Sequence, residues 1–251
     1  MVSKDLRLLN AFASTIVATM KAAEISVERP DFRGIDAWIF DLDHTLYTLN
    51  AVRQAAMEER ICVFVRRHFG IARAPAWEIQ KRYLKDYGTT LGGLMRHHAV
   101  DPDVYHDAVN DLGALGLESS AALRAGLSRL PGKRLVFTNN CGRFARGVLE
   151  RLGVADLFGD IVDARALNYR SKPDPAAYDA LVALGGFEAR NAVLFDDSMR
   201  NLVPARALGM RTVWFNNGMG QSHWRVEKPE LHIDHETGDL AAFLQSIRIA
   251  P

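Results

Sequence analysis

Short apolar runs alternate with helical patterns along most of the second half of the chain. Strands are predicted at 135–137, 161–162, 192–195, 212–215 and near 231–233. Helices are predicted at 143–152, 176–184, 201–208 and 240–247. This alternation is typical of a parallel sheet with helices on both faces. With an earlier apolar run at 36–40 as one more strand, the pattern predicts an α/β fold with a doubly wound, Rossmann-like core.

A helical block interrupts the core directly after that first strand. Helices are predicted at 52–65, 77–87, 94–99, 104–112 and 121–130, and the block shows no convincing strand. An insertion at this place overhangs the carboxyl edge of the sheet, where open α/β folds bind ligands. We therefore expect an α/β core at 36–50 and 125–251 and an inserted all-helical cap domain at 51–124.

The first 35 residues are predicted to be a helical extension followed by a linker. Apolar residues recur at helical spacing between residues 4 and 25, which predicts an amphipathic helix. The uncharged stretch at 8–20 is shorter than the about 20 apolar residues that a membrane span needs. A packed helix or a loose arm is favoured over a membrane-surface or export role.

Composition narrows the class of protein. The 251 residues are 48% hydrophobic and 24% charged, as in a globular chain of one large or two small domains. With 31 Lys and Arg against 30 Asp and Glu, the chain lacks the basic excess of a dedicated nucleic-acid binder. Two cysteines make no disulfide framework, so a cytoplasmic location is expected.

Two acids directly follow the first predicted strand. Asp41 and Asp43 come after the apolar run at 36–40 and precede Thr45 and Leu46. An arbitrary pair of acids at this spacing is more often a helix cap and a solvated carboxylate. Their position at the end of a buried strand favours a site instead.

Three further strand ends carry polar groups. Thr138 and Asn139, with Asn140, form either a plain helix cap or an anion site at a helix start. Lys172 stands just before a helix that Asp174 and Pro175 are expected to begin, and by itself it reads as a solvated lysine. Asp196 and Asp197 follow another strand and repel each other unless a cation such as Mg²⁺ partners them.

The four groups in this order resemble the four motifs of the haloacid dehalogenase-like superfamily of aspartate-based phosphotransferases, over residues 36–247. Within it, the chain is most similar to pyrimidine 5′-nucleotidase-like phosphatases. The residues behind this narrower resemblance are 41–47, 87–94 and 195–198, with Asn201, Leu202, Ala205 and 208–210. Two positions depart from the subgroup: His44 stands where Asn is more frequent, and Asn140 where Gly is common.

The resemblance implies a Mg²⁺-dependent phosphomonoester hydrolase. Asp41 is then the nucleophile that forms an aspartyl-phosphate, and Asp43 is the general acid and base. Thr138, Asn139 and Lys172 are expected to hold the phosphate. Mg²⁺ is expected at the Asp41 side chain, the Asp43 backbone carbonyl and Asp197, with Asp196 close by or direct.

Cap residues are expected to select the leaving group. Candidates are Tyr47, Tyr83, Tyr87, Thr89, Leu91 and Leu94, although each is more often a packing residue at such spacing. Pyrimidine nucleoside 5′-monophosphates are the leading substrate, with sugar phosphates or other small phosphate esters as the alternative. No nucleic acid or membrane partner is expected, and the oligomeric state stays open.

Three other functions compete with this interpretation. A dehalogenase has no need of a second acid as proton donor, so Asp43 counts against it. A phosphomutase uses both acids and stays open. A non-enzymatic phosphate- or metal-binding scaffold should have lost at least one motif residue, and none is missing.

Overall fold

The computed structural model describes residues 29–218 and 226–249, and they are built around a six-stranded parallel sheet. The strands are β1 (Ala37–Phe40), β2 (Lys133–Phe137), β3 (Asp160–Val162), β4 (Ala192–Asp196), β5 (Arg211–Phe215) and β6 (His235–Thr237). Their spatial order, β3-β2-β1-β4-β5-β6, is that of a doubly wound sheet. The expected α/β fold is therefore confirmed, whereas the helix expected at 4–25 lies outside the described residues.

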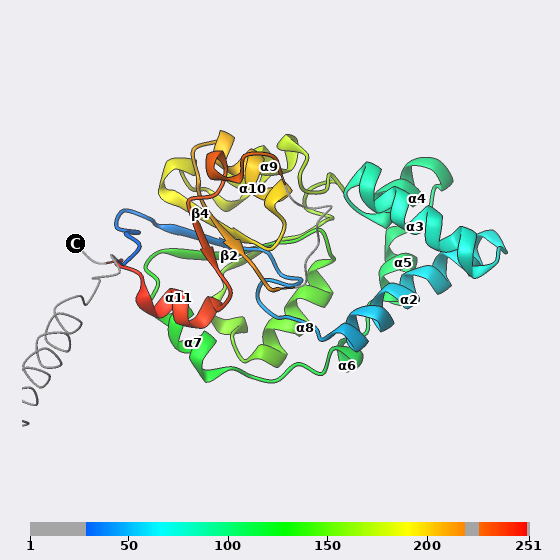
Figure 1. The fold of residues 1–251 in the computed structure, drawn as a ribbon, viewed down its shortest axis with the longest axis horizontal. Helices are drawn as coiled ribbons and strands as arrows, with labels where there is room; N and C mark the ends of the chain where they lie inside the picture. Colours follow the sequence, from blue (N-terminus) through cyan, green and yellow to red (C-terminus); the bar gives the residue numbers. More distant parts are fainter. Residues whose placement is uncertain (1–28, 219–225, 250–251) are drawn as a thin grey trace, which may run out of the picture. The chain divides into compact units, whose positions relative to one another are not determined.

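Helices cover both faces of the sheet (Figure 1). They are α7 (Ala121–Ser128), α8 (Gly142–Leu152), α9 (Pro175–Gly185), α10 (Met199–Ala207) and α11 (Leu240–Ser246). Alternate residues of a strand point to opposite faces. Trp38 and Phe40 accordingly pack in the cluster with α7, α8 and α11, whereas Ala37 and Ile39 pack with α9 and α10. Burial on both faces explains why this strand reads as a continuous apolar run.

A helical insertion separates β1 from β2, as expected. It contains α2 (Ala51–Phe69), α3 (Arg73–Tyr87), α4 (Thr90–His98), α5 (Pro102–Val109) and α6 (Leu112–Leu115). These helices have an apolar cluster of their own, in which Val65, Tyr83, Leu94 and Tyr105 are buried. Within the described residues, no helix is both long enough and apolar enough to cross a membrane.

The end of this insertion packs with the sheet. Leu115, Leu123 and Leu127 lie in the same apolar cluster as Trp38 and Phe40 of β1. Residues 112–124, which the sequence assigns to the cap, therefore contact the core. We propose that the cap ends near residue 111.

The prediction of a strand near 231–233 is wrong. Pro229–Leu231 form a 3₁₀ turn (η4), and the amides of His232 and Ile233 both donate to the Pro229 carbonyl at 2.9 Å. The Leu231 side chain is 58% exposed, so it marks no buried strand. The sixth strand is β6, whose His-Glu-Thr sequence has no apolar run that would have predicted it.

Candidate active site

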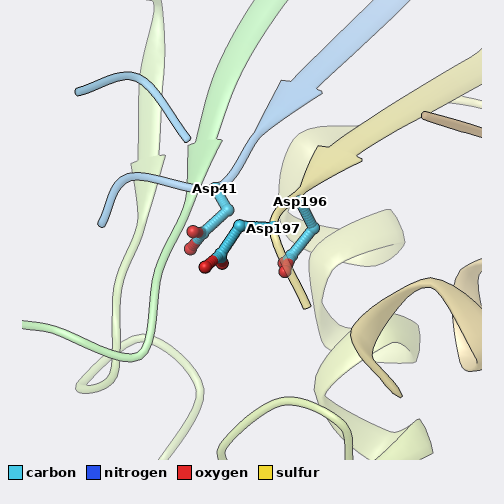
Figure 2. Close-up of side chains that lie close together, drawn as sticks. All are labelled: Asp41, Asp196 and Asp197. Carbon is cyan, nitrogen blue, oxygen red and sulfur yellow. The ribbon is translucent and has the colours of Figure 1, made fainter. Parts of the chain in front are cut away.

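The first acid of the site follows β1 and lies beside the end of β4. Phe40 pairs with Phe195, and the amide of Asp41 donates to the Phe195 carbonyl at 2.9 Å. Asp41 is thus next to Asp196, the last residue of β4. Parallel strands end at the same edge of a sheet, so residues that follow them meet there. Figure 2 shows Asp41, Asp196 and Asp197 gathered at these strand ends.

A buried lysine neutralises part of this acid cluster. The Nζ of Lys172 donates to Asp41 Oδ1 at 2.6 Å, to Asp196 Oδ2 at 2.8 Å and to the Phe137 carbonyl at 2.9 Å. Burial by itself lowers the pKa of Lys172, but the two carboxylates outweigh burial and raise the pKa above its usual value. Lys172 therefore stays charged and is not the solvated surface lysine that it resembles when considered alone.

Asn139 holds the loop that carries this lysine. Its Oδ1 accepts from the Lys172 amide at 2.8 Å, and its Nδ2 donates to the Lys172 carbonyl at 3.2 Å. The side chain is therefore already engaged in both directions. We propose that any contact of Asn139 with phosphate uses its backbone N–H.

Thr138, the third expected phosphate ligand, is buried in the segment between β2 and α8. Its Oγ1 accepts from the Asn140 amide at 3.0 Å. A hydroxyl that accepts one bond can still donate another, because it carries its own proton. Thr138 can therefore offer this proton to a phosphate oxygen.

The two neighbouring acids after β4 have different surroundings. The Asp196 carboxylate accepts from Lys172, from the Ser198 amide at 2.9 Å and from Asn201 Nδ2 at 2.9 and 3.1 Å. In contrast, the Asp197 carboxylate accepts one bond from residues 29–218 and 226–249, a long one of 3.4 Å from Asn217 Nδ2. Within these residues, Asp196 is thus saturated with hydrogen-bond donors, and Asp197 has oxygen lone pairs to spare.

This donor set fits a hard divalent cation. One carboxylate oxygen from each of Asp41, Asp196 and Asp197 lies within 4.8 Å of the others. Mg²⁺ prefers oxygen ligands and is held through one or two carboxylates. We propose that Asp41, Asp197 and the backbone carbonyl of Asp43 hold it, while Asp196 anchors Lys172.

The acids are hard to ionise without a cation. Burial raises the pKa of Asp197 to about 9, and the charges of Asp196 and Asp41 add to this effect. Burial also raises the pKa of Asp41 to about 7, although Lys172 opposes the shift. A proton and a metal ion therefore compete for these carboxylates.

Mg²⁺ affinity should consequently rise with pH. A carboxylate must lose its proton before it ligates. Between the pKa of Asp41, about 7, and that of Asp197, about 9, the Asp197 proton dominates, so we expect up to about a tenfold gain per pH unit from pH 7 to pH 9. Calorimetric titration of the full chain with Mg²⁺ at several pH values measures this slope. Asp197→Asn should bind Mg²⁺ weakly and lose most of the slope, and an equally pH-dependent affinity in that variant would contradict the assignment.

Asp43 lies between Tyr47 and Asn140. The Tyr47 hydroxyl donates a short hydrogen bond to Asp43 Oδ1, and Asn140 Nδ2 approaches Oδ2 at 3.4 Å. Burial and the Asp43 carboxylate raise the pKa of Tyr47 well above its usual value, so the hydroxyl keeps its proton. These contacts orient the Asp43 carboxyl group. Tyr47, expected as a substrate-selecting residue, thus contacts an acid of the site.

His44 adopts a left-handed backbone conformation, with φ of 66°. Asn, Asp and His enter this region more readily than other non-glycine residues, which explains how His44 replaces Asn here. Burial lowers the pKa of His44, against the pull of the Asp43 carboxylate. The neutral ring is therefore favoured beside the acids.

The other cap candidates fall into two groups. Tyr83 and Leu94 are buried in the cap's own cluster, and Tyr87 packs at its edge, where its hydroxyl bonds His97. Thr89 and Leu91 line a cavity that also reaches Asp43. Of the cap candidates, these two have the position that contact with a leaving group requires.

This cavity has a volume of about 460 Å³ and lies between the cap helices and the strand ends. Polar residues that the sequence reasoning missed also line it, namely Gln54, Glu58, Gln80, His106 and Asn110. They come from α2, α3 and α5 and from the residue after α5. No motif marks them, because polar residues on amphipathic helices look the same whether they face solvent or a cavity.

Known proteins with sequences similar to this chain include a phosphatase and a phosphate metabolism protein. A phosphoglycolate phosphatase of Rhodospirillum rubrum is 33% identical over 205 residues, which cover 72% of this chain and 80% of that protein. Phosphate metabolism protein 8 of Saccharomyces cerevisiae is 25% identical over 83% of this chain and 71% of its own length. These relatives support the wider superfamily that the four motifs resemble, but not its narrower pyrimidine 5′-nucleotidase-like subgroup.

Solved structures share the fold. The 2-haloacid dehalogenase of Pseudomonas syringae superposes with a TM-score of 0.54 at 22% identity, over 84% of this chain and 97% of that one. At this identity the similarity concerns the fold alone. The family of haloacid dehalogenase-like hydrolases matches residues 35–209, which include the four groups of polar residues at the strand ends. The chain therefore belongs to the haloacid dehalogenase-like hydrolases.

Proposed function

We propose that the protein is a Mg²⁺-dependent phosphatase of small phosphate esters that acts through an aspartyl-phosphate on Asp41. The observation that carries the proposal is the buried Lys172, whose Nζ bridges Asp41 and Asp196. A fixed positive charge beside a buried acid suits the transfer of a phosphoryl group, because positioning and charge stabilisation dominate that reaction. The phosphatases among the relatives support the same chemistry.

Asp41 has the geometry of a nucleophile. Lys172 holds its Oδ1 at 2.6 Å, while Oδ2 has a longer contact with Thr45 Oγ1 at 3.3 Å. Oδ2 attacks phosphorus, and the bond from phosphorus to the ester oxygen breaks. The covalent route divides hydrolysis into two displacements of lower barrier.

Asp43 moves the protons in both halves of the reaction. It protonates the departing ester oxygen and then accepts a proton from the water that attacks the aspartyl-phosphate. Tyr47 and Asn140 keep its carboxyl group in position. A dehalogenase needs no such donor, so Asp43 favours a phosphatase over the dehalogenase activity of proteins with a similar fold.

Thr138 can bond an oxygen of the transferring phosphoryl group, and Lys172, whose three N–H groups are engaged by Asp41, Asp196 and the Phe137 carbonyl, acts through its charge. Lys172 supplies a positive charge, and the Thr138 hydroxyl supplies a hydrogen bond. Bound Mg²⁺ would neutralise charge on the same oxygens.

The substrate class is broader than the motif resemblance suggests. The sequence favours pyrimidine nucleoside 5′-monophosphates, but the relatives include phosphoglycolate phosphatases. We therefore propose a small phosphate ester, such as a sugar phosphate, and retain nucleotides as a narrower prediction. A phosphomutase would release no phosphate to water, so phosphate release separates the two.

Chelation tests the metal requirement. The protein should release phosphate from p-nitrophenyl phosphate with Mg²⁺ and lose almost all of this activity in excess EDTA, with recovery when Mg²⁺ is restored. Phosphate release measured across sugar phosphates, phosphoglycolate and nucleotides then ranks the substrates. Full turnover in EDTA would refute the metal role, and no release from any ester would refute the phosphatase.

A further inference from the structure

The cavity beside Asp43 gathers buried polar atoms that lack a hydrogen-bond partner among the described residues. The buried side-chain atoms in this state are His44 Nδ1, Gln54 Oε1, Gln80 Oε1, His106 Nε2 and Ser198 Oγ. All of them except Ser198 belong to residues that line the cavity. Native proteins pair nearly all buried polar groups, with protein, water or ligand. These atoms are concentrated around one cavity, but each is itself almost fully covered by protein. A ligand in the cavity therefore pairs them only when their side chains turn toward it.

Two of these atoms are hydrogen-bond acceptors. Gln54 Nε2 donates to Glu58 Oε1 at 3.0 Å, and Gln80 Nε2 donates to the Glu58 carbonyl at 3.2 Å. A carboxylate and a backbone carbonyl can only accept, so both amides must present nitrogen to Glu58. Both amide oxygens are therefore the unpaired atoms. A ligand satisfies them only if it donates hydrogen bonds.

The third unpaired atom, His106 Nε2, is a hydrogen-bond donor. Asn110 Nδ2 approaches His106 Nδ1 at 3.4 Å, and because an amide nitrogen only donates, Nδ1 is the accepting atom of the ring. Burial lowers the pKa of His106, which favours the neutral ring. The ring proton then lies on Nε2, the unpaired atom. Its partner must accept a hydrogen bond.

The part of the chain that the structure describes offers no free positive charge in this cavity to a carboxylate. Among the described lining residues, only Lys81 is a lysine or an arginine. Its Nζ lies 2.9 Å from Glu58 Oε2 and 4.5 Å from the centre of the Trp77 ring. The His106 Nε2 proton suits a carboxylate, but Glu58 and the two amide oxygens can only accept hydrogen bonds and disfavour one. A leaving group such as glycolate is therefore poorly matched.

Size agrees with this chemistry. A volume of about 460 Å³ equals that of roughly fifteen water molecules, much more than a two-carbon acid fills. Apolar side chains of Met57, Ile61 and Leu84 form other parts of the wall and can cover a carbon skeleton. A hydroxyl group both donates and accepts, so it can pair an amide oxygen and the His106 Nε2 proton alike.

We propose that this cavity selects an uncharged leaving group with several hydroxyls, so that the preferred substrates are sugar phosphates or nucleoside monophosphates rather than phosphates of small carboxylic acids. The shared chemistry is the row of sugar hydroxyls, which both substrate types carry. This inference rests on the proposed phosphatase function and specifies its substrate.

Relative turnover tests the proposal. With the full chain and Mg²⁺, kcat/KM for ribose 5-phosphate or a nucleoside 5′-monophosphate should exceed that for phosphoglycolate by about tenfold or more. A higher kcat/KM for the nucleotide than for ribose 5-phosphate would show that the base adds contacts. Similar kcat/KM values for the two substrates would show that the sugar is sufficient. Equal or greater kcat/KM for phosphoglycolate would overturn the proposal.

Variants of Gln54 and Gln80 test whether these two residues cause the preference for sugar phosphates. Gln80→Leu and Gln54→Leu should each lower the ratio of kcat/KM for ribose 5-phosphate over phosphoglycolate about tenfold. Gln245→Leu is the matched control, because Gln245 also donates to a backbone carbonyl but lies on α11, outside the cavity lining. Thermal melting shows whether each variant folds. If the Gln80 variant does not fold, the variant of the half-buried Gln54 provides the test. An unchanged ratio in folded variants would overturn the proposal.

Binding separates failure of this inference from failure of the phosphatase function. Calorimetry on Asp41→Asn compares the affinities of ribose 5-phosphate and phosphoglycolate without turnover. If no ester is hydrolysed by the native protein, the phosphatase proposal fails, and the affinities still decide what the cavity prefers. Tighter binding of phosphoglycolate would reject the hydroxyl-selective cavity.

Discussion

Asp41→Asn should abolish phosphate release from every ester, with a loss of about 10⁴-fold or more in kcat. The amide keeps the shape of the side chain but cannot attack phosphorus. The fold should survive, because Lys172 keeps its bonds to Asp196 and to the Phe137 carbonyl. Phosphate release and thermal melting of the purified variant measure the two effects.

The matched control for this variant is Asp179→Asn. Asp179 lies exposed on α9, away from the strand ends, so its variant should keep the native rate. Substantial turnover by folded Asp41→Asn would mean that water attacks phosphorus directly, and the covalent route would have to be abandoned.

Asp43→Asn should lower turnover of a nucleotide or sugar phosphate by about 10²–10⁴-fold, the usual contribution of a general acid. The asparagine oxygen can still accept the Tyr47 hydrogen bond, so the side chain should stay in place while losing its proton donor. The loss should depend on the leaving group. An alkoxide needs a proton to depart, whereas nitrophenolate, with its far lower pKa, needs little help.

The comparison of two substrates therefore separates the steps. If formation of the aspartyl-phosphate is rate-limiting, the variant should lose much more rate with a nucleotide than with p-nitrophenyl phosphate. If breakdown of the aspartyl-phosphate limits, both rates fall together, since Asp43 also activates the water. A burst of nitrophenolate identifies the second case. A native rate on the best nucleotide would remove Asp43 as acid and base.

The local pattern of apolar residues was sufficient to predict strands that are buried on both faces of the sheet. Strands β1, β2, β4 and β5 are short apolar runs, and each was expected within a residue or two of its observed bounds. Strand β6 was missed because its polar residues pair at a partly exposed edge of the sheet. There, hydrogen bonding to β5 forms the strand, and side-chain hydrophobicity carries no signal.

The residues at the strand ends were also predictable, and the family resemblance already favoured Asp197 over Asp196 as a Mg²⁺ ligand. The hydrogen-bond partners that distinguish the two acids were not predictable. Asp196 and Asp197 are adjacent in sequence, yet one is saturated with donors and the other has capacity for a cation. Phosphate binding by Asn139 stays a prediction, whereas the bonds of its side chain to the Lys172 loop could not be predicted. Such roles depend on partners from distant segments, which only the folded chain brings together.

The sequence by itself determined the strand and helix order, the parallel sheet and the acids that meet at its carboxyl edge. These follow from local periodicity and from the rule that parallel strands end at one edge. Only the tertiary structure decided which acid pairs with Lys172 and which helix faces enclose the cavity beside Asp43. The physical reason is that hydrogen bonding and burial arise between residues as far apart as Asp41 and Lys172, whereas periodicity records the preferences of neighbours alone.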